Sequence, residues 1–387
     1  MSTYRAHRAP SRALIVAVVA VAVVLVVAIV GLFVAHKPDA TAGSSGRSGT
    51  HDTSSSGSQV ATEALASTSP KQGATNVSPE GPITLNLTEP LASGSPMPSI
   101  SPNVDGSWAL TSSTTLTFEP KASLVPFQTY TVTVPGGSDG LRGASGTHLA
   151  SSVHFKFKVA AGSFLRLQQL LAELEFLPVA FAPQSTAAVP ATQMAMPQVG
   201  NFNWRWSGMP SQLTSLFLEG GDDVLTQGAV MTFEEMHGLT PDGIAGPDVW
   251  TDLLQAAAQH QVDPNPWNWV YVQKTPEPEM VYVWSDGKQV FSTVANTGAV
   301  GFVTPDGSWP VYEHFPSTEM KGTNPDGQPY DDKNVLWVSY FYDGDALHAF
   351  LRGSYGTPQS LGCVEMPTSA AQTVYPYTPI GTVVTIQ

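Results

Sequence analysis

An uninterrupted apolar segment near the N-terminus limits what the whole chain can be. Residues 13–35 are 23 consecutive apolar or glycine positions without a charge, enough to cross about 30 Å of hydrocarbon as one helix. Arg5, Arg8 and Arg12 precede it, so the positive-inside rule predicts a cytoplasmic tail over residues 1–12 and the rest of the chain outside the cell. A cleaved signal peptide is the alternative, although its apolar region is normally about 7 to 15 residues long. We therefore expect an uncleaved, single-pass anchor in the cell membrane.

Composition narrows the class of the part that follows. The net charge is -14 with only 17 Lys and Arg, which argues against nucleic acid as a partner because phosphate binding needs clustered cations. A single Cys among 387 residues excludes an intramolecular disulfide and a Cys-rich zinc site. Residues 36–69 are rich in Gly, Ser, Thr and Ala, and we expect them to form a flexible linker.

Short β-branched segments fill residues 70–160. Apolar and polar residues alternate in four segments, namely 83–87, 114–118, 130–134 and 153–159. This pattern, with turn residues between the segments, predicts an all-β sandwich. The region also resembles the bacterial immunoglobulin-like modules of surface proteins, through the opening Pro-Lys-Gln-Gly-Ala-Thr at residues 70–75, Asp-Gly-Ser-Trp at 105–108 and Phe-Glu-Pro at 118–120. The resemblance implies a spacer without catalytic residues.

The periodicity changes to that of helices over residues 163–260. Apolar residues from Phe164 to Leu177 lie on one face of a helix, and further helices are predicted over 228–237 and from Pro247 to Gln259. The motifs Leu-Gln-Gln-Leu-Leu (167–171), Ala-Val-Met-Thr-Phe-Glu (229–234) and Gly-Leu-Thr-Pro-Asp-Gly-Ile-Ala-Gly-Pro (238–247) resemble the three-helix peptidoglycan-binding module of bacterial wall enzymes. A long insertion with a Pro-rich stretch at 178–197 separates the first two helices. A plain helical linker domain is the alternative.

β-structure returns in the last region, residues 267–387. Strands are predicted over 269–273, 280–284 and 289–295, with a hairpin turn at Asp286-Gly287. The same region contains the only cysteine, Cys363, with His348 fifteen positions upstream. A free Cys is most often a buried apolar residue. The alternative is a thiolate nucleophile, which needs a neighbouring imidazole as base and backbone N–H groups at the point of attack.

A series of motifs favours the nucleophile. Residues 296–298 (Asn-Thr-Gly), 304–311 (Thr-Pro-Asp-Gly-Ser-Trp-Pro-Val), 320–322 (Met-Lys-Gly), 337–341 (Trp-Val-Ser-Tyr-Phe), His348 and 360–363 (Ser-Leu-Gly-Cys) follow one another as in the catalytic domain of L,D-transpeptidases, which this region resembles. The resemblance implies a mainly-β fold and acyl transfer on peptidoglycan stem peptides, with Cys363 as nucleophile and His348 as base. Ser360 is expected to orient the imidazole, and the N–H groups of Gly362 and Cys363 to bind the oxyanion.

Four further residues are candidates for substrate binding: Met320, Tyr330, Arg352 and Glu365. Tyr330 belongs to the segment that forms a lid in the family, and Arg352 could supply a cation for a stem-peptide carboxylate. The family often has His before the Gly-Cys pair and Arg or Asn two residues after the Cys, whereas this chain has Leu361 and Glu365. No metal or cofactor is expected, because His314 and His348 alone cannot form a zinc site.

The sequence therefore predicts a membrane-anchored enzyme that faces the cell wall and contacts peptidoglycan stem peptides and glycan. Its leading function is an L,D-transpeptidase that forms 3→3 cross-links through a Cys thioester. An L,D-carboxypeptidase would use the same thioester and resolve it with water. The rival from another class is an inactive wall-binding scaffold, which the residues at positions 361 and 365 motivate.

Overall fold

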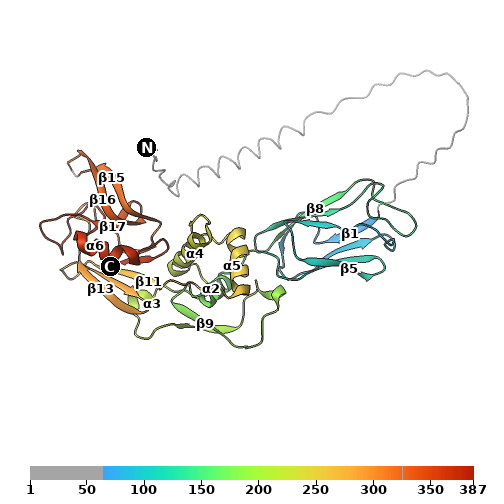
Figure 1. Ribbon diagram of the computed structural model, residues 1–387, viewed down its shortest axis with the longest axis horizontal. Helices are drawn as coiled ribbons and strands as arrows, with labels where there is room; N and C mark the ends of the chain where they lie inside the picture. The colour runs from blue at the N-terminus through green and yellow to red at the C-terminus, as the bar shows by residue number, and fades with distance from the viewer. Residues whose placement is uncertain (1–63, 325) are drawn as a thin grey trace, which may run out of the picture. The chain divides into compact units, whose positions relative to one another are not determined.

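The computed structural model describes residues 64–324 and 326–387 (Figure 1). The predicted cytoplasmic tail (1–12), membrane anchor (13–35) and most of the linker (36–69) lie outside the described residues, and so these predictions remain untested. Among the residues that are described, no helix is both long and apolar enough to cross a membrane.

The first described part is a sandwich of two four-stranded sheets. Its strands are β1 (Leu65–Ser69), β2 (Ala74–Val77), β3 (Ile83–Leu87), β4 (Ser99–Ser101), β5 (Gly106–Ser112), β6 (Thr115–Pro120), β7 (Thr129–Val134) and β8 (Val153–Val159). The sheets have the orders β1-β3-β6-β5 and β2-β8-β7-β4. Strand β1 begins at Leu65 and pairs with β3, so ordered structure starts before residue 70, where the sequence placed the end of the linker.

Alternating side chains from both sheets form the core of this sandwich. Ile83 and Leu85 of β3 are fully buried, and Phe155 and Phe157 of β8 meet them in the same cluster. Burial of each such side chain stabilises the fold by about 1.5 to 3 kcal/mol. The polar residues between them face water. This is why apolar and polar residues alternate along these strands in the sequence.

The middle part is helical with a small hairpin. Its elements are α2 (Phe164–Glu173), β9 (Val179–Pro183), the 3₁₀ turn η1 (Ala191–Gln193), β10 (Gly200–Trp204), α3 (Ser211–Thr214), α4 (Val224–His237) and α5 (Pro247–Gln259). Helix α5 has the predicted bounds. Helix α2 is shorter than the apolar periodicity suggested, because Leu174 and Leu177 are buried beyond its end without continuing the helix.

Helix α4 begins before the predicted residue 228, because a residue outside the apolar pattern caps it. The Asp223 carboxylate accepts a hydrogen bond from the Thr226 N–H at 2.7 Å, which satisfies one of the free donors at the helix start. At the other end Gly238 adopts φ 69°, a left-handed conformation that glycine reaches without a steric penalty. The resemblance of this region to a peptidoglycan-binding module stays a prediction.

The helical core continues into the C-terminal sheet. Trp269 and Val383 of that sheet are buried in the same cluster as the helical residues Leu253 and Phe233. Helix α4 approaches the chain near Gly381 so closely that a Cβ on Gly228 would lie 2.4 Å from the Gly381 carbonyl oxygen. Glycine at position 228 is therefore what permits this contact.

The C-terminal part is mainly β-structure in two sheets. Its elements are β11 (Asn268–Gln273), β12 (Met280–Ser285), β13 (Lys288–Val294), β14 (Gly307–Pro310), β15 (Glu313–Thr323), β16 (Pro329–Tyr342), β17 (Asp345–Ala349), β18 (Val364–Met366), α6 (Thr368–Val374), the 3₁₀ turn η2 (Tyr375–Tyr377) and β19 (Val383–Ile386). The sheet orders are β13-β12-β11-β19-β14 and β15-β16-β17-β18. The predicted hairpin turn is present, with Asp286 and Gly287 both at positive φ.

A core between these two sheets fixes the second sheet in place. Val270 and Val283 from the first sheet meet Leu347 and Val364 from the second, and all four are almost completely buried. Helix α6 adds Ala371 to the same cluster. One face of the sheet β15-β16-β17-β18 thus packs in the core, and a functional site can form only on its other face.

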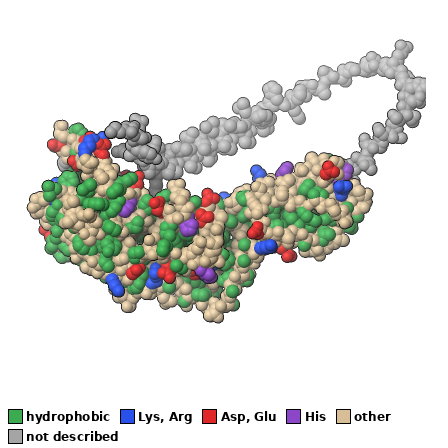
Figure 2. Space-filling model, in the orientation of Figure 1, with side chains coloured by type: hydrophobic (Ala, Val, Ile, Leu, Met, Phe, Trp, Pro, Cys, Tyr) green, Lys and Arg blue, Asp and Glu red, His purple; other side chains and the backbone are tan. Residues whose placement is uncertain are grey.

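The long hairpin β15–β16 has a network of charges near its tip. Lys321 forms ion pairs with Glu319 at 2.7 Å and with Asp331 at 3.5 Å, and Lys333 contacts the same two carboxylates. In Figure 2, blue and red side chains gather on the part of the surface where Figure 1 places β15 and β16. Both lysines of the hairpin are therefore already paired.

Candidate active site

The parallel pairing of β17 with β18 brings the predicted nucleophile and base to one face of the sheet. Leu347 pairs with Val364, and His348 pairs with Glu365. Because Leu347 and Val364 point into the core, the alternation of a strand directs His348, Glu365 and the adjoining Cys363 to the opposite face.

Hydrogen bonds hold the turn that precedes Cys363 in one shape. The Ser360 hydroxyl donates to the Cys363 carbonyl oxygen at 2.5 Å and accepts from the Gly362 N–H at 3.2 Å. The Thr304 hydroxyl donates to the Gly362 carbonyl oxygen at 2.6 Å. Gly362 has φ +124°, a backbone conformation that residues other than glycine rarely adopt. The turn therefore presents Cys363 at a fixed position.

These bonds correct two of the expected roles. Ser360 was expected to orient the imidazole, but its hydroxyl is used within the turn and its carbonyl accepts from the Ala299 N–H at 2.9 Å. The Gly362 N–H was expected to bind the oxyanion, but it already donates to Ser360. The Cys363 N–H is left as the backbone candidate for that role.

A backbone carbonyl orients the imidazole instead. His348 is buried, and its Nδ1 lies 2.9 Å from the Ala349 carbonyl oxygen. A carbonyl only accepts hydrogen bonds, so Nδ1 must carry the proton and Nε2 keeps a free lone pair. Burial lowers the pKa of His348 below its ordinary value, which keeps the ring neutral and able to accept a proton at neutral pH. No side-chain pattern could have indicated the Ala349 carbonyl.

The thiol of Cys363 is held in its neutral form. Burial, and then the negative charges of Asp345 and Glu365, raise its pKa to about 12, against the lowering effect of the Ala346 N–H. Its Sγ lies 4.0 Å from the Gly344 carbonyl oxygen, and among the described residues no hydrogen bond joins Sγ to the imidazole. The sequence predicts a thiolate near neutral pH, whereas here both the thiol and the imidazole are neutral.

Residues of the hairpin surround the thiol as expected for a lid. Met320 and Tyr340 pack with Cys363 against the small cluster of Val335, Val338 and Ala346. Tyr330 is close enough for the charge of the Cys363 thiolate to raise the pKa of its hydroxyl, after the larger effect of burial. The structure thus brings Met320 and Tyr330 to the predicted site, together with Tyr340. Tyr342 packs on Trp309 instead.

Arg352 and Glu365 bind each other and leave no free charge for a substrate. The guanidinium forms two short contacts with the carboxylate, Nε to Oε2 at 2.6 Å and a terminal nitrogen to Oε1 at 2.7 Å. The Glu365 side chain is 6% exposed and that of Arg352 is 30% exposed. The expected role of Arg352 as a cation for a stem-peptide carboxylate is therefore not supported. Glu365 is beside His348 in the sheet, and its carboxylate is paired with the Arg352 guanidinium there.

Removal of Arg352 should destabilise the domain more than removal of the pair. Arg352→Gln leaves a buried carboxylate without a partner, which costs roughly 3 kcal/mol. The double variant Arg352→Gln/Glu365→Gln removes that charge and should recover most of the loss. Urea unfolding of the full chain, followed by tryptophan fluorescence, measures both. Equal destabilisation by the single and double variants would contradict the pairing argument.

The Asn-Thr-Gly motif at 296–298 holds the loop beside the site through hydrogen bonds. The buried Asn296 side chain accepts from the Gly356 N–H at 2.9 Å and donates to the Ser354 carbonyl oxygen at 3.1 Å. Its backbone exchanges two hydrogen bonds with Glu365. The motif therefore fixes the loop between β17 and β18 and contributes no chemistry of its own.

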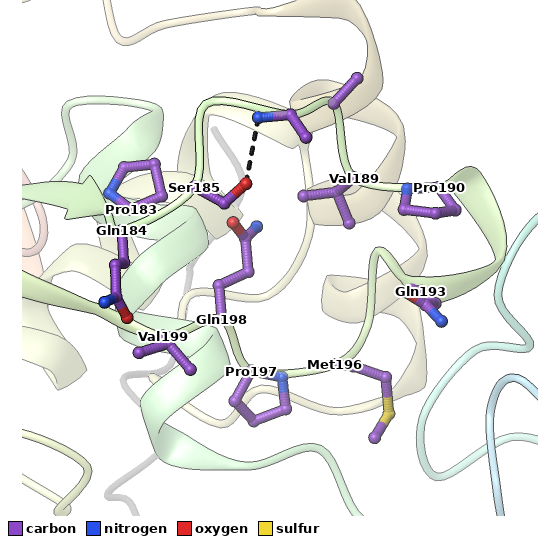
Figure 3. A pocket seen from close by; sticks show the side chains of 12 residues that line it. Pro183, Gln184, Ser185, Val189, Pro190, Gln193, Met196, Pro197, Gln198 and Val199 are labelled. Atoms are coloured by element: carbon purple, nitrogen blue, oxygen red, sulfur yellow. Dashed lines mark hydrogen bonds between the residues drawn. The ribbon is translucent and has the colours of Figure 1, made fainter.

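A metal site or a second pocket could also supply catalytic groups among the described residues. No group of three or more His, Cys, Asp or Glu within them is arranged to hold a metal ion. A pocket of about 460 Å³ lies in the insertion between α2 and α4 (Figure 3). Its twelve lining residues lie between Pro183 and Val199 and none is ionisable, so none of them can serve as the acid or base that would activate the Ser185 hydroxyl.

The geometry described above places a cysteine and a neutral imidazole on one face of a β-sheet, with the hairpin residues Met320, Tyr330 and Tyr340 near the thiol. Residues 268–386, which include Cys363 and His348, match the family profile of the L,D-transpeptidase catalytic domain. Residues 60–159 match that of a bacterial Ig-like domain. The resemblances predicted for these two regions are confirmed. No curated protein matches the chain.

Several solved structures are similar to the chain. An L,D-transpeptidase from Mycobacterium smegmatis is 12% identical with a TM-score of 0.28, over 84% of this chain and 98% of that one. L,D-transpeptidase 3 from Mycobacterium tuberculosis gives 12% identity and a TM-score of 0.29 with the same coverage. The catalytic domain of an L,D-transpeptidase from E. faecium is 25% identical with a TM-score of 0.28, over 31% of this chain and 96% of that one.

Proposed function

We propose that this protein is a peptidoglycan L,D-transpeptidase that forms 3→3 cross-links through a thioester on Cys363. The observation that carries the proposal is that one face of the sheet holds both a turn-held thiol and an imidazole whose Nδ1 is fixed by the Ala349 carbonyl. The family match of residues 268–386 supports the same reaction class.

The first half-reaction forms the thioester. The Cys363 sulfur attacks the carbonyl carbon after the third residue of a donor stem, while the thiol proton passes to Nε2 of His348. The oxyanion is stabilised by the Cys363 N–H, and one such donor is worth about 3 kcal/mol in the transition state. The C–N bond then breaks, and the leaving D-Ala amine takes the proton from the imidazolium.

The second half-reaction decides between the two candidate enzymes. An amine of a neighbouring stem attacks the thioester carbonyl in a transpeptidase, and water does so in a carboxypeptidase. In both, the C–S bond breaks and the sulfur regains its proton. The lid residues Met320, Tyr330 and Tyr340 beside Cys363 favour the amine, because an apolar cover excludes water from the acyl-enzyme.

We also propose where the protein lies in the cell and what the regions before the catalytic domain do there. Residues 13–35 anchor the protein in the cell membrane, the Ig-like sandwich serves as a spacer, and the helical region contacts peptidoglycan. The catalytic domain then faces the cell wall.

Product analysis tests the proposal. Purified full-length protein is incubated with tetrapeptide-containing muropeptides, and the products are separated and identified by mass spectrometry. We expect 3→3 cross-linked dimers and free D-Ala. Tripeptides without dimers would support the carboxypeptidase, and unchanged muropeptides would support the inactive scaffold; either result contradicts the transpeptidase.

A further inference from the structure

One carboxylate in the site has no part in the proposed acylation. Asp345 opens strand β17, and its Oδ1 lies so close to Gly362 that a Cβ on that glycine would be 2.2 Å from it. The carboxylate thus occupies the space beside the nucleophile turn that the missing side chain of Gly362 leaves open. Within the described part of the chain, neither a hydrogen bond nor an ion pair reaches the Asp345 carboxylate.

This position is unfavourable for the nucleophile. The negative charge of Asp345 contributes to the raised pKa of Cys363, because a nearby like charge disfavours the thiolate. A carboxylate here opposes the first half-reaction. Once the sulfur is acylated the site holds no thiolate, and the same charge no longer opposes the chemistry.

The sheet supplies no cation to neutralise Asp345. Residues 313–366 contain three Lys or Arg: Arg352 is bound to Glu365, and Lys321 and Lys333 are bound to Glu319 and Asp331. The neighbouring charge is Asp343, which is also negative. A half-buried, unpartnered carboxylate beside a reacting carbonyl is suited to a cation that arrives with the substrate.

We propose that Asp345 recognises the acceptor, its carboxylate receiving the protonated amine of the acceptor stem peptide beside the Cys363 thioester. This inference rests on the proposed transpeptidase function. One proton passes from the ammonium group to Asp345, and the free amine nitrogen then attacks the thioester carbonyl carbon. As the C–S bond breaks, a second amine proton passes through His348 to the sulfur. An amide with one N–H, a neutral thiol and a protonated Asp345 result, so atoms and charges balance.

The acidity of this carboxyl supports such a role. Burial, and then the charge of Asp343, raise the pKa of Asp345 to about 6. Near neutral pH the group is therefore ionised and can bind an ammonium, yet it is a better proton acceptor than an ordinary aspartate. The other ionisable groups that sense its charge are Cys363, Tyr312 and Tyr330, and all three are neutral at that pH.

A partition experiment tests the inference. The full-length wild type, Asp345→Asn and the control Asp343→Asn are given a donor tetrapeptide and increasing concentrations of a stem tripeptide with a free side-chain amine. Cross-linked and hydrolysed products are counted by mass spectrometry. We expect Asp345→Asn to lower the ratio of aminolysis to hydrolysis roughly tenfold or more and to raise the KM for the acceptor, as for loss of a charge-assisted hydrogen bond. Asp343→Asn removes the same charge two residues away, at an exposed position, and should change the ratio by less than about twofold.

Two further readouts separate this inference from the function on which it rests. Acylation by a thiol-reactive carbapenem needs no acceptor, and it should be faster in Asp345→Asn because a charge that opposes the thiolate is gone. In the wild type the partition ratio should fall as pH drops through about 6, and the variant should lack that inflection. Equal ratios in Asp345→Asn and wild type, or loss of acylation in Asp345→Asn, overturn the inference. A wild type that never acylates overturns the proposed function instead.

Discussion

Cys363→Ala should abolish cross-link formation, with a loss of at least roughly 10⁴-fold in turnover, as when the nucleophile of an acyl-transfer enzyme is removed. No other cysteine exists in the chain to replace it. Cys363→Ser keeps the size of the side chain, but a hydroxyl ionises less readily than a thiol, so we expect a comparable loss. The measurement is the initial rate of dimer formation from tetrapeptide muropeptides.

The control for this prediction is a substitution of the same kind in the adjoining loop. Ser354 is exposed, and its carbonyl, not its side chain, accepts from Asn296. Ser354→Ala should therefore keep activity within about twofold of the wild type. Cross-linking by Cys363→Ala at more than about one tenth of the wild-type rate would show that the thiol is not the nucleophile.

His348→Asn should lower the acylation rate by about 10² to 10⁴-fold, the usual contribution of a general base. The Asn amide can still donate to the Ala349 carbonyl but provides no base at the Nε2 position. His348→Gln places its amide nearer the Nε2 position and should lose as much. Since burial raises the pKa of Cys363 to about 12, the variants depend on hydroxide, and their rates should rise about tenfold per pH unit between pH 7 and 9.

The wild type should behave differently with pH. Burial lowers the pKa of His348 below its ordinary value of 6.5, so the neutral base is present throughout the neutral range and the rate should stay level from pH 7 to 9. His260→Asn serves as the control, because His260 is exposed at the left-handed end of α5, where Asn is tolerated. A His348 variant with the pH profile of the wild type would remove the imidazole from the mechanism.

Sequence reasoning predicted the folds where burial alternates regularly. Strands β3 and β8 and helix α5 have the predicted bounds, because one face of each is committed to a core. The predictions were less accurate where tertiary contacts determine the bounds of an element. Strand β1, for example, lies in a segment too polar to suggest a strand and is held by pairing with β3. Helix α4 starts at its Asp223 cap, and not at its first apolar repeat.

The sequence predicted which residues form the site better than it predicted the hydrogen-bond partners of those residues. Motif spacing singled out Cys363 and His348, and strand pairing brings them to one face. The partners of each group depend on geometry that spacing does not encode. The Ala349 carbonyl has no side-chain signature, and the pairing of Arg352 with Glu365 joins residues thirteen positions apart. Asp345 was not among the predicted site residues, although its position three residues before His348 could have suggested a place at the site.

Every step of the proposed reaction depends on Cys363 as the reactive nucleophile. The most direct test is intact-protein mass spectrometry of the full-length chain after incubation with a carbapenem, with peptide mapping of any product. We expect one covalent adduct per chain, located on Cys363 and absent from Cys363→Ala. A wild-type mass that is unchanged, or an adduct that persists in Cys363→Ala, would contradict it.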